Sequence, residues 1–350
     1  MSDRREFLRA AAGAALAFGA FGANAQAAPK RVMVGGRRVS VIDVHAHCLF
    51  PEVASRVPNV RVPRAAPPTL VMGPERIAAM DERGIDIQAL SVNTYWWYSA
   101  NRADASAVVA THDEGLAAWC KEHSTRFVAL SSVALQFPDL AAEQLEHAVK
   151  TLGARGASIG GHVLNEPPTS EKYDPFWAKA EELDVPVFMH PNNALNIARE
   201  GALDGRGGLG NIVGNPLETT VFLSRMIFDG TLDRFPRLKV CAAHGGGYLT
   251  SYLGRSDAAC VVRDDANCAN KRKPSEYFKD QIVVDSMVFS SEGLRHLVAE
   301  TGVSQVVYGS DQPYFWPDTI DLIVEAPFLS NADKDAILSG NLRRLLRISA

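Results

Sequence analysis

The chain has 350 residues, of which 47% are apolar, so it is long enough for one large barrel or two smaller domains with a substantial core. Its formal net charge is −4 and its sequence pI is about 6.2. Because this slightly acidic chain has no cluster of Lys and Arg with interleaved aromatic residues, its composition argues against nucleic-acid binding.

The first segment predicts an export signal rather than part of the fold. Arg4 and Arg5 form a twin-arginine pair, an Ala- and Gly-rich apolar run follows over 10–23, and small-x-small cleavage sites come next. The apolar run is too short and too rich in small residues for a membrane span. We therefore expect a twin-arginine signal peptide over 1–27, a mature domain over 28–350, and a periplasmic location without a membrane span.

Eight short apolar runs alternate with longer segments of helical character. Strands that alternate with helices imply a parallel sheet, and eight such units predict an α/β protein with a (β/α)8 TIM barrel. An open doubly wound sheet is the alternative, but no Gly-x-Gly-x-x-Gly follows the first run. The runs cover 39–44, 85–92, 126–133, 156–161, 185–189, 238–243, 281–285 and 305–310, and helices are expected near 75–84, 104–123, 138–152, 174–183, 216–234, 246–262, 291–301 and 331–347.

Two irregular segments and the cysteines complete the outline. The proline-rich insertion 48–74 follows the first strand directly, and the Asn- and Gly-rich segment 192–215 follows the fifth, so both are expected to line or cover a site. The five cysteines fit no zinc module. Cys260 and Cys268 could form a disulfide in an oxidising compartment, although a protein that folds before export does not need one.

A His-x-His pair closes the first predicted strand. Side chains alternate across a strand, so His45 and His47 point the same way and aim two imidazoles at one point, as a metal site requires. Three further metal-ligating side chains close other runs: His190, His244 and Asp311. Because active sites of TIM barrels lie where the strands end, all five side chains are expected on one face of the barrel.

These residues stand in motifs that together resemble a known family. The motifs are Asp43-Val-His45-Ala-His47, Phe188-Met-His190-Pro191, Gly214-Asn-Pro216-Leu-Glu218, His244-Gly-Gly-Gly247 and Gly309-Ser-Asp311-Gln-Pro313. They resemble the amidohydrolase superfamily, and most closely its branch of 2-amino-3-carboxymuconate-6-semialdehyde decarboxylase. The resemblance extends from about residue 39 to 347. It departs at Asn192-Asn193, where decarboxylases of that branch often carry Trp-Asp.

The resemblance implies one catalytic Zn²⁺ per chain, or another divalent metal such as Mn²⁺. Such an ion keeps an open position for a water molecule and lowers the pKa of that water toward ~7. His244 is then the adjacent acid/base, because imidazole titrates near neutral pH. The implied ligands are His45, His47, His190 and Asp311.

The resemblance also implies a site completed by two chains. Arg255 matches a family arginine that enters a neighbouring subunit and binds the substrate carboxylate, which a guanidinium can hold with two hydrogen bonds. A second family arginine falls in the insertion before Pro74, where Arg61 and Arg64 both fit. We therefore expect a homodimer or larger homo-oligomer that acts on a small-molecule carboxylate.

Other residues near the strand ends allow two interpretations each. His162, at the end of the fourth run, either faces the pocket or has a structural role. The aromatic stretch 95–98, which includes Trp96, either stacks on a planar substrate or forms a subunit interface. Asp285 either orients a metal ligand or steers the substrate. Histidines inside predicted helices, such as His112, are expected to be solvated.

Three functions compete for this pattern. The leading hypothesis is a metal-dependent non-oxidative decarboxylase, a carboxy-lyase, of a small unsaturated or aromatic carboxylic acid. The alternative is a metal-dependent hydrolase or hydratase, such as a lactonase, acting on a cyclic or unsaturated acid. The third is a periplasmic metal- or ligand-binding protein without turnover, and His244 argues against it because storage needs no acid/base.

Overall fold

The computed structural model describes residues 28–64, 67–192, 194 and 197–349. The expected signal peptide therefore lies outside the described residues, as does Asn193. A short hairpin of β1 (Met33–Val34) and β2 (Arg37–Arg38) precedes the main fold.

Within the described ranges, each of the eight predicted runs contains a strand, and each run therefore supplies one of eight positions in the barrel. β5 and β6 are separated by Leu130 alone and share one position. Neighbouring positions pair in parallel and in chain order wherever the sheets are continuous. The strands are β3 (Ile42–His47), β4 (Ile87–Ser91), β5 (Phe127–Ala129) with β6 (Ser131–Ser132), β7 (Ala157–Ile159), β8 (Val187–Met189), β9 (Val240–Ala242), β10 (Ile282–Asp285) and β11 (Val306–Val307).

Backbone hydrogen bonds close these strands into a barrel. Leu130 N donates to Leu90 O at 2.9 Å, which carries the sheet from β4 across to the β5–β6 position and on to β7. At the opposite join, His47 N donates to Gln312 O at 2.7 Å, so β3 lies beside the continuation of β11. The expected (β/α)8 TIM barrel is confirmed, and the open doubly wound sheet is wrong.

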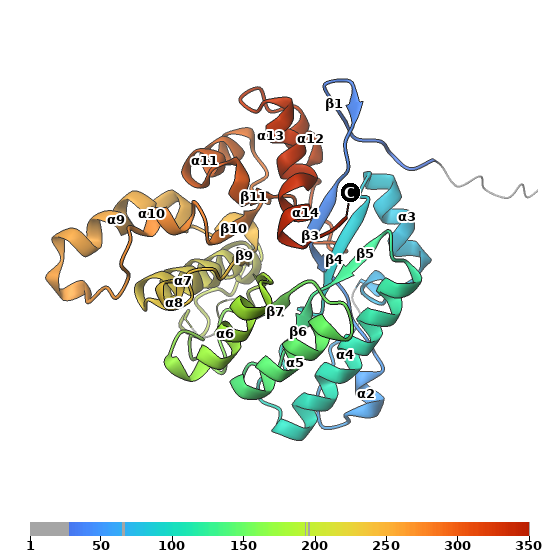
Figure 1. Ribbon diagram of the computed structural model, residues 1–350, viewed down its shortest axis with the longest axis horizontal. Helices are drawn as coiled ribbons and strands as arrows, with labels where there is room; N and C mark the ends of the chain where they lie inside the picture. The colour runs from blue at the N-terminus through green and yellow to red at the C-terminus, as the bar shows by residue number, and fades with distance from the viewer. Residues whose placement is uncertain (1–27, 65–66, 193, 195–196, 350) are drawn as a thin grey trace, which may run out of the picture.

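Helices surround the strands, as Figure 1 shows. Local sequence sets several of their ends: Pro74 and Pro138 occupy first turns, where a missing N–H costs nothing, and the side chain of Asn101 accepts a hydrogen bond from Asp104 N. None of the helices among the described residues is both long and apolar enough to span a bilayer. The helices are α2 (Val53–Arg56), α3 (Pro74–Arg83), α4 (Arg102–Glu122), α5 (Pro138–Lys150), α6 (Asp174–Leu183), α7 (Asn215–Phe228), α8 (Thr231–Arg234), α9 (Leu253–Val262), α10 (Pro274–Tyr277), α11 (Ser291–Thr301), α12 (Ile320–Val324), α13 (Asn331–Asp335) and α14 (Asn341–Leu345).

The buried apolar side chains form two clusters that alternate along the strands. On β8, Phe188 belongs to a smaller cluster with Cys241, whereas Val187 and Met189 belong to a larger one that includes the helix faces. This alternation is the period of two expected when one strand face fills the barrel and the other packs on helices. The barrel is therefore a packed scaffold that leaves its functional groups at the strand ends.

The structure decides two further expectations: it contains the disulfide that the sequence left open, and it buries a histidine that was expected to be solvated. Cys260 and Cys268 are joined by a disulfide, which links α9 to the loop that follows it on an arm projecting from the barrel (Figure 1). The expectation that His112 is solvated is wrong. The loop after β4 covers α4 here, so His112 is fully buried, its ring 4.8 Å from that of Trp97 and its Nε2 3.2 Å from Tyr95 Oη. Burial lowers the pKa of His112 to about 3.

Candidate metal centre

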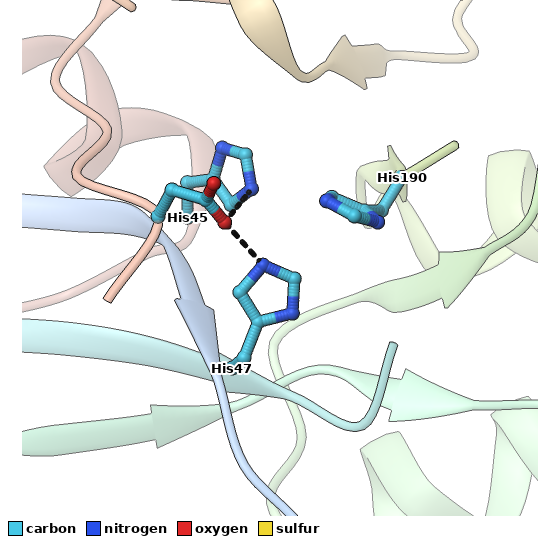
Figure 2. Close-up of side chains that lie close together, drawn as sticks. His45, His47 and His190 are labelled. Atoms are coloured by element: carbon cyan, nitrogen blue, oxygen red, sulfur yellow. Dashed lines mark hydrogen bonds and ion pairs between the residues drawn. The ribbon is translucent and has the colours of Figure 1, made fainter. Parts of the chain in front are cut away.

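Four predicted ligands converge where the strands end. His45 and His47 close β3, His190 directly follows β8, and Asp311 follows β11. One ligand atom from each lies within 4.8 Å of the other three. Asp311 Oδ1 lies 2.6 Å from His47 Nε2 and 3.1 Å from His45 Nε2, and Figure 2 shows the three imidazoles grouped around one point.

Unpartnered nitrogen atoms indicate that this cluster fits a metal ion. The four side chains are between 0 and 8% exposed. Among the described residues, His47 Nδ1 and His190 Nδ1 are nevertheless buried without a hydrogen-bond partner, and His45 Nε2 faces Asp311 Oδ1 at 3.1 Å without a well-aligned hydrogen bond. Because buried polar atoms are normally hydrogen-bonded, such a group of orphaned nitrogens calls for a ligand. Three imidazoles and one carboxylate form the donor set that suits Zn²⁺ and related divalent ions.

The protonation states also suit a cation. Burial lowers the pKa of His47 and holds that of His190 well below its usual range, so both imidazoles are neutral. Burial opposes ionisation of Asp311, but the charges of His45 and His47 and their hydrogen bonds together outweigh it and hold the pKa of that carboxyl well below its usual range. Burial likewise disfavours charge on His45, yet Asp311 and Asp285 raise its pKa to about 10. Positive charge is therefore stabilised at the centre, where a metal ion would supply it.

A buried polar network fixes the strand that carries two of the predicted ligands. The pairing of β3 with β4 shifts register between Asp43 and Ala46. At that shift the Asp43 carboxylate accepts hydrogen bonds from His45 N at 3.0 Å, Ser310 Oγ at 2.6 Å and Gln88 Nε2 at 2.9 Å. These bonds tie β3 to both neighbouring strands and hold the His-x-His segment in place.

His244 lies beside the cluster. Its ring centroid is 5.1 Å from that of His45 and 5.5 Å from that of His190, and its Nδ1 is buried and unpartnered in the described structure. Burial, together with the charge on His45, lowers the pKa of His244 to about 4. His244 and Asp311 both have positive φ, 57° and 58°, which non-glycine residues rarely adopt and which recurs at functional sites.

The glycines after His244 allow the turn that presents it. Gly245, Gly246 and Gly247 all have positive φ. A Cβ on Gly247 would lie 2.3 Å from Pro216 O, so no larger residue fits there.

The predicted substrate arginines do not join the cluster. Arg61, Arg64 and Arg255 are exposed, and none of them has a hydrogen bond or ion pair with another described residue. Arg255 lies on α9, in the arm that projects from the barrel (Figure 1).

His162 and Trp96 lie on loops beside the strand ends. His162 is partly exposed, and its Nε2 lies 3.9 Å from Glu218 Oε1. Trp96 stacks on Tyr98 with ring centroids 5.5 Å apart, and its Nε1 is buried without a partner among the described atoms. A Cβ on Gly160 would lie 3.0 Å from that nitrogen, so the indole packs against the loop after β7.

Sequence reasoning missed several supporting residues. Arg76 is 1% exposed inside α3, and its guanidinium donates to His47 O at 2.6 Å and Thr69 O at 2.9 Å. A single arginine in an amphipathic helix gives no signal of such burial. Glu218 stands inside a motif that the sequence brought forward, but no role followed from it. Asp285, which the sequence did single out, accepts a hydrogen bond at 2.7 Å from Nδ1 of the predicted ligand His45, as the interpretation that it orients a ligand requires.

Comparison with known proteins finds a family and relatives over most of the chain. A family model described as Amidohydrolase matches residues 42–348. A 2-amino-3-carboxymuconate-6-semialdehyde decarboxylase of Dictyostelium discoideum is 31% identical over 276 residues, which cover 77% of this chain and 75% of the relative.

Two solved structures share the fold over most of their length. A 5-carboxyvanillate decarboxylase from Sphingomonas paucimobilis superposes with a TM-score of 0.80 and 25% identity, covering 89% of this chain and all of that one. A dihydroxybenzoic acid decarboxylase from Polaromonas sp. JS666, solved with bound manganese and the inhibitor 2-nitroresorcinol, has a TM-score of 0.77 and 26% identity, covering 89% of this chain and 97% of that one.

Proposed function

Because the chain belongs to the amidohydrolase family, we propose that it is a metal-dependent decarboxylase of a small aromatic or unsaturated carboxylic acid. The observation that carries this proposal is the buried cluster of three histidines and one aspartate with His244 beside it. The relatives that share the fold are named as decarboxylases of 5-carboxyvanillate, dihydroxybenzoate and 2-amino-3-carboxymuconate-6-semialdehyde, which are planar acids.

We propose that His45, His47, His190 and Asp311 hold one divalent ion. The manganese bound in the Polaromonas structure supports Mn²⁺ as the ion. The three imidazoles and one carboxylate also suit Zn²⁺. When bound, the ion would stabilise developing negative charge as a Lewis acid and lower the pKa of a bound water toward ~7. The protein contributes neutral imidazoles, an ionised carboxylate and a buried, fixed geometry.

His244 is the proposed acid/base. Its imidazole lies beside the cluster, and its Nδ1 has no partner among the described residues, so the ring is free to take up and give a proton there. It would deliver its proton to the ring or chain carbon that carries the carboxylate, after which the C–C bond breaks and CO2 leaves with the carboxylate oxygens. The proton taken up by the product carbon balances the one that His244 gives, and solvent restores it.

The remaining predicted residues are proposed substrate contacts. Trp96 offers a ring face and a free N–H beside the strand ends, which suits a planar acid with a polar substituent. His162 would donate a hydrogen bond to such a group. Arg255 is exposed in the first turn of α9 and is unpaired among the described residues, which supports its acting in a neighbouring subunit of a homo-oligomer. Arg61 and Arg64 remain alternatives for the second arginine.

A carboxylate panel tests the function. The protein loaded with Mn²⁺ or Zn²⁺ would be mixed with aromatic and unsaturated carboxylic acids, while released CO2 and loss of substrate absorbance are followed together. The expected result is equimolar CO2 and substrate loss for at least one planar acid, and none with His45→Ala. Substrate loss without CO2, or turnover of lactones alone, would instead show a hydratase or hydrolase.

We also propose that residues 1–27 direct export of the folded chain and that 28–350 form one mature domain. Sequencing the N-terminus of protein from periplasmic extracts would test this. The expected sequence begins near Gln26 or Ala28, and an intact Met1 on periplasmic protein would contradict it.

A further inference from the structure

Glu218 is a buried carboxylate that the proposed chemistry does not use. It lies in the first turn of α7 and is 1% exposed. Its Oε1 accepts a hydrogen bond from Gly161 N at 3.1 Å, and its Oε2 accepts from Asn192 N at 2.7 Å and Ala194 N at 3.0 Å. Three backbone N–H groups therefore converge on one side chain, which holds a carboxylate more firmly than a single bond would.

The three N–H groups come from the loops after two neighbouring strands. Gly161 follows β7 and immediately precedes His162, whose Nε2 lies 3.9 Å from Glu218 Oε1. Asn192 follows β8 and is two residues beyond His190. One carboxylate thus connects the loop of a proposed substrate contact to the loop of a proposed metal ligand.

The loop after β7 packs tightly against Glu218. A Cβ on Gly161 would lie 2.6 Å from Glu218 Oε1 and 2.5 Å from Met189 Cε, and real contacts of a Cβ are never so short. Tyr98 holds the preceding residue, because Gly160 N donates to its Oη at 3.0 Å. The loop after β7 is therefore pressed directly against the carboxylate, and a shift of Glu218 must move the loop.

We propose that Glu218 is a positioning residue of the metal centre, which fixes the two loops so that His190 and His162 keep their places around the bound ion and the substrate. This inference rests on the proposed metal site and adds a residue to it. Only a carboxylate offers acceptors on both oxygens to three N–H donors. An amide turns one acceptor into a donor that faces an N–H group, and an aspartate is one methylene too short to reach both loops.

The test uses Glu218→Gln and Glu218→Asp, with Glu82→Gln on the exposed surface of α3 as the matched control. Hydrogen exchange of peptides that contain Gly161, Asn192 and Ala194 reports the loops. The visible spectrum and the dissociation constant of the Co²⁺-loaded protein report the ligand geometry. In both Glu218 variants we expect faster exchange at these amides, a changed Co²⁺ spectrum and a dissociation constant raised at least about tenfold, the usual effect of losing a group that orients a ligand. Glu82→Gln should change none of these.

Two results would overturn the proposal. Faster exchange with an unchanged Co²⁺ spectrum and affinity would show a purely structural role, and unchanged exchange would show that the loops do not depend on Glu218. If the Glu218 variants do not fold, Gly161→Ala carries the same test, because its new Cβ must displace the carboxylate. Co²⁺ binding does not depend on turnover, so failure of the decarboxylase proposal and failure of this one give different results.

Discussion

The Asp285 carboxylate at the end of β10 lies 2.7 Å from Nδ1 of His45 at the end of β3, and both side chains are fully buried. With Nδ1 committed to this bond, Nε2 is the nitrogen left to meet a cation. The same carboxylate accepts from His244 N at 3.0 Å and Gly245 N at 2.8 Å. Asp285 therefore aligns a proposed metal ligand and the proposed acid/base together.

Replacing Asp285 by Asn should weaken metal binding. The amide cannot support the same charge at His45, so we expect the dissociation constant for Mn²⁺ or Zn²⁺ to rise about 10- to 100-fold. A competition titration with a chromophoric chelator measures it, and Asp264→Asn on the exposed surface is the control. Equal affinity in the Asp285 and Asp264 variants would show that the His45–Asp285 bond does not tune the ligand.

Removing a proposed ligand should remove the metal. Purified protein should hold about one divalent ion per chain, and His45→Ala or Asp311→Ala should lose ion and activity together, because each removes one of four donors. His147→Ala, which changes an exposed histidine on α5, should keep both. Elemental analysis decides, and full occupancy in the first two variants would rule out the assigned shell.

His244→Ala should separate metal binding from turnover. Its imidazole is outside the group of four ligand atoms, so the variant should keep its metal. The rate of turnover should fall ~10²–10⁴-fold, the usual contribution of one acid/base group. Steady-state kinetics on the substrate found in the carboxylate panel provide the measurement. Turnover within a few-fold of the unaltered protein would mean that the proton comes from elsewhere.

Arg255→Ala should impair the use of an acidic substrate. Losing a desolvated carboxylate contact costs ~2–5 kcal/mol, so kcat/KM should fall at least ~30-fold. Arg263 is an exposed arginine that directly follows the same helix, so Arg263→Ala is the control and should change kcat/KM little. Comparable kcat/KM for the two variants would mean that Arg255 does not bind substrate.

A mixed dimer then tells whether Arg255 acts across the subunit interface. One chain carries His244→Ala and the other carries Arg255→Ala. If the arginine acts in the neighbouring site, one site collects both defects and the other is intact, so about half the activity returns. No recovery, or a fully active monomer, would place Arg255 in its own site or outside the chemistry.

Asp113 should give the stability of the protein a dependence on pH. It is buried on α4, its Oδ2 accepts from Ser131 Oγ at 2.7 Å, and burial raises its pKa from 3.8 to about 7. Between these values the folded state holds more protons than the unfolded state. The free energy of unfolding should therefore fall as pH rises from about 4 to 7, by at most ~1.4 kcal/mol per pH unit from this group.

Asparagine has the shape of a neutral aspartic acid but does not titrate. Asp113→Asn should therefore remove the contribution of this group to the pH dependence of stability. Urea unfolding at pH 5 and pH 8 should show a smaller loss of stability between the two conditions for the variant than for the unaltered protein. Asp264→Asn should behave like the unaltered protein. An equal loss in all three would show that Asp113 does not titrate in this range.

The barrel could be predicted from the sequence because strand runs and helix patterns are local signals. The convergence of His45, His47, His190 and Asp311 followed from the same pattern, since strand ends of a barrel share one face; that they bind a metal stays a prediction. Among the supporting contacts, the sequence offered ligand orientation as one of two interpretations of Asp285 but did not predict its partner, and the other contacts were not predicted. The His45–Asp285 bond joins residues 240 positions apart, and the burial of Arg76 and His112 depends on loops whose path no local signal describes.

The barrel closes where its first and last strands meet, and both of these strands carry proposed metal ligands. A chain emerging from the ribosome has His45 and His47 early but completes the proposed set only when Asp311 has been made, so the whole set could hold the ion only from that point on. An ion bound there would link the first and last strands of the barrel. Its binding free energy would then add directly to the stability of the closed barrel. If the folded chain is exported as proposed, the metal content of the compartment of synthesis, rather than that of the destination, would decide which ion the protein carries.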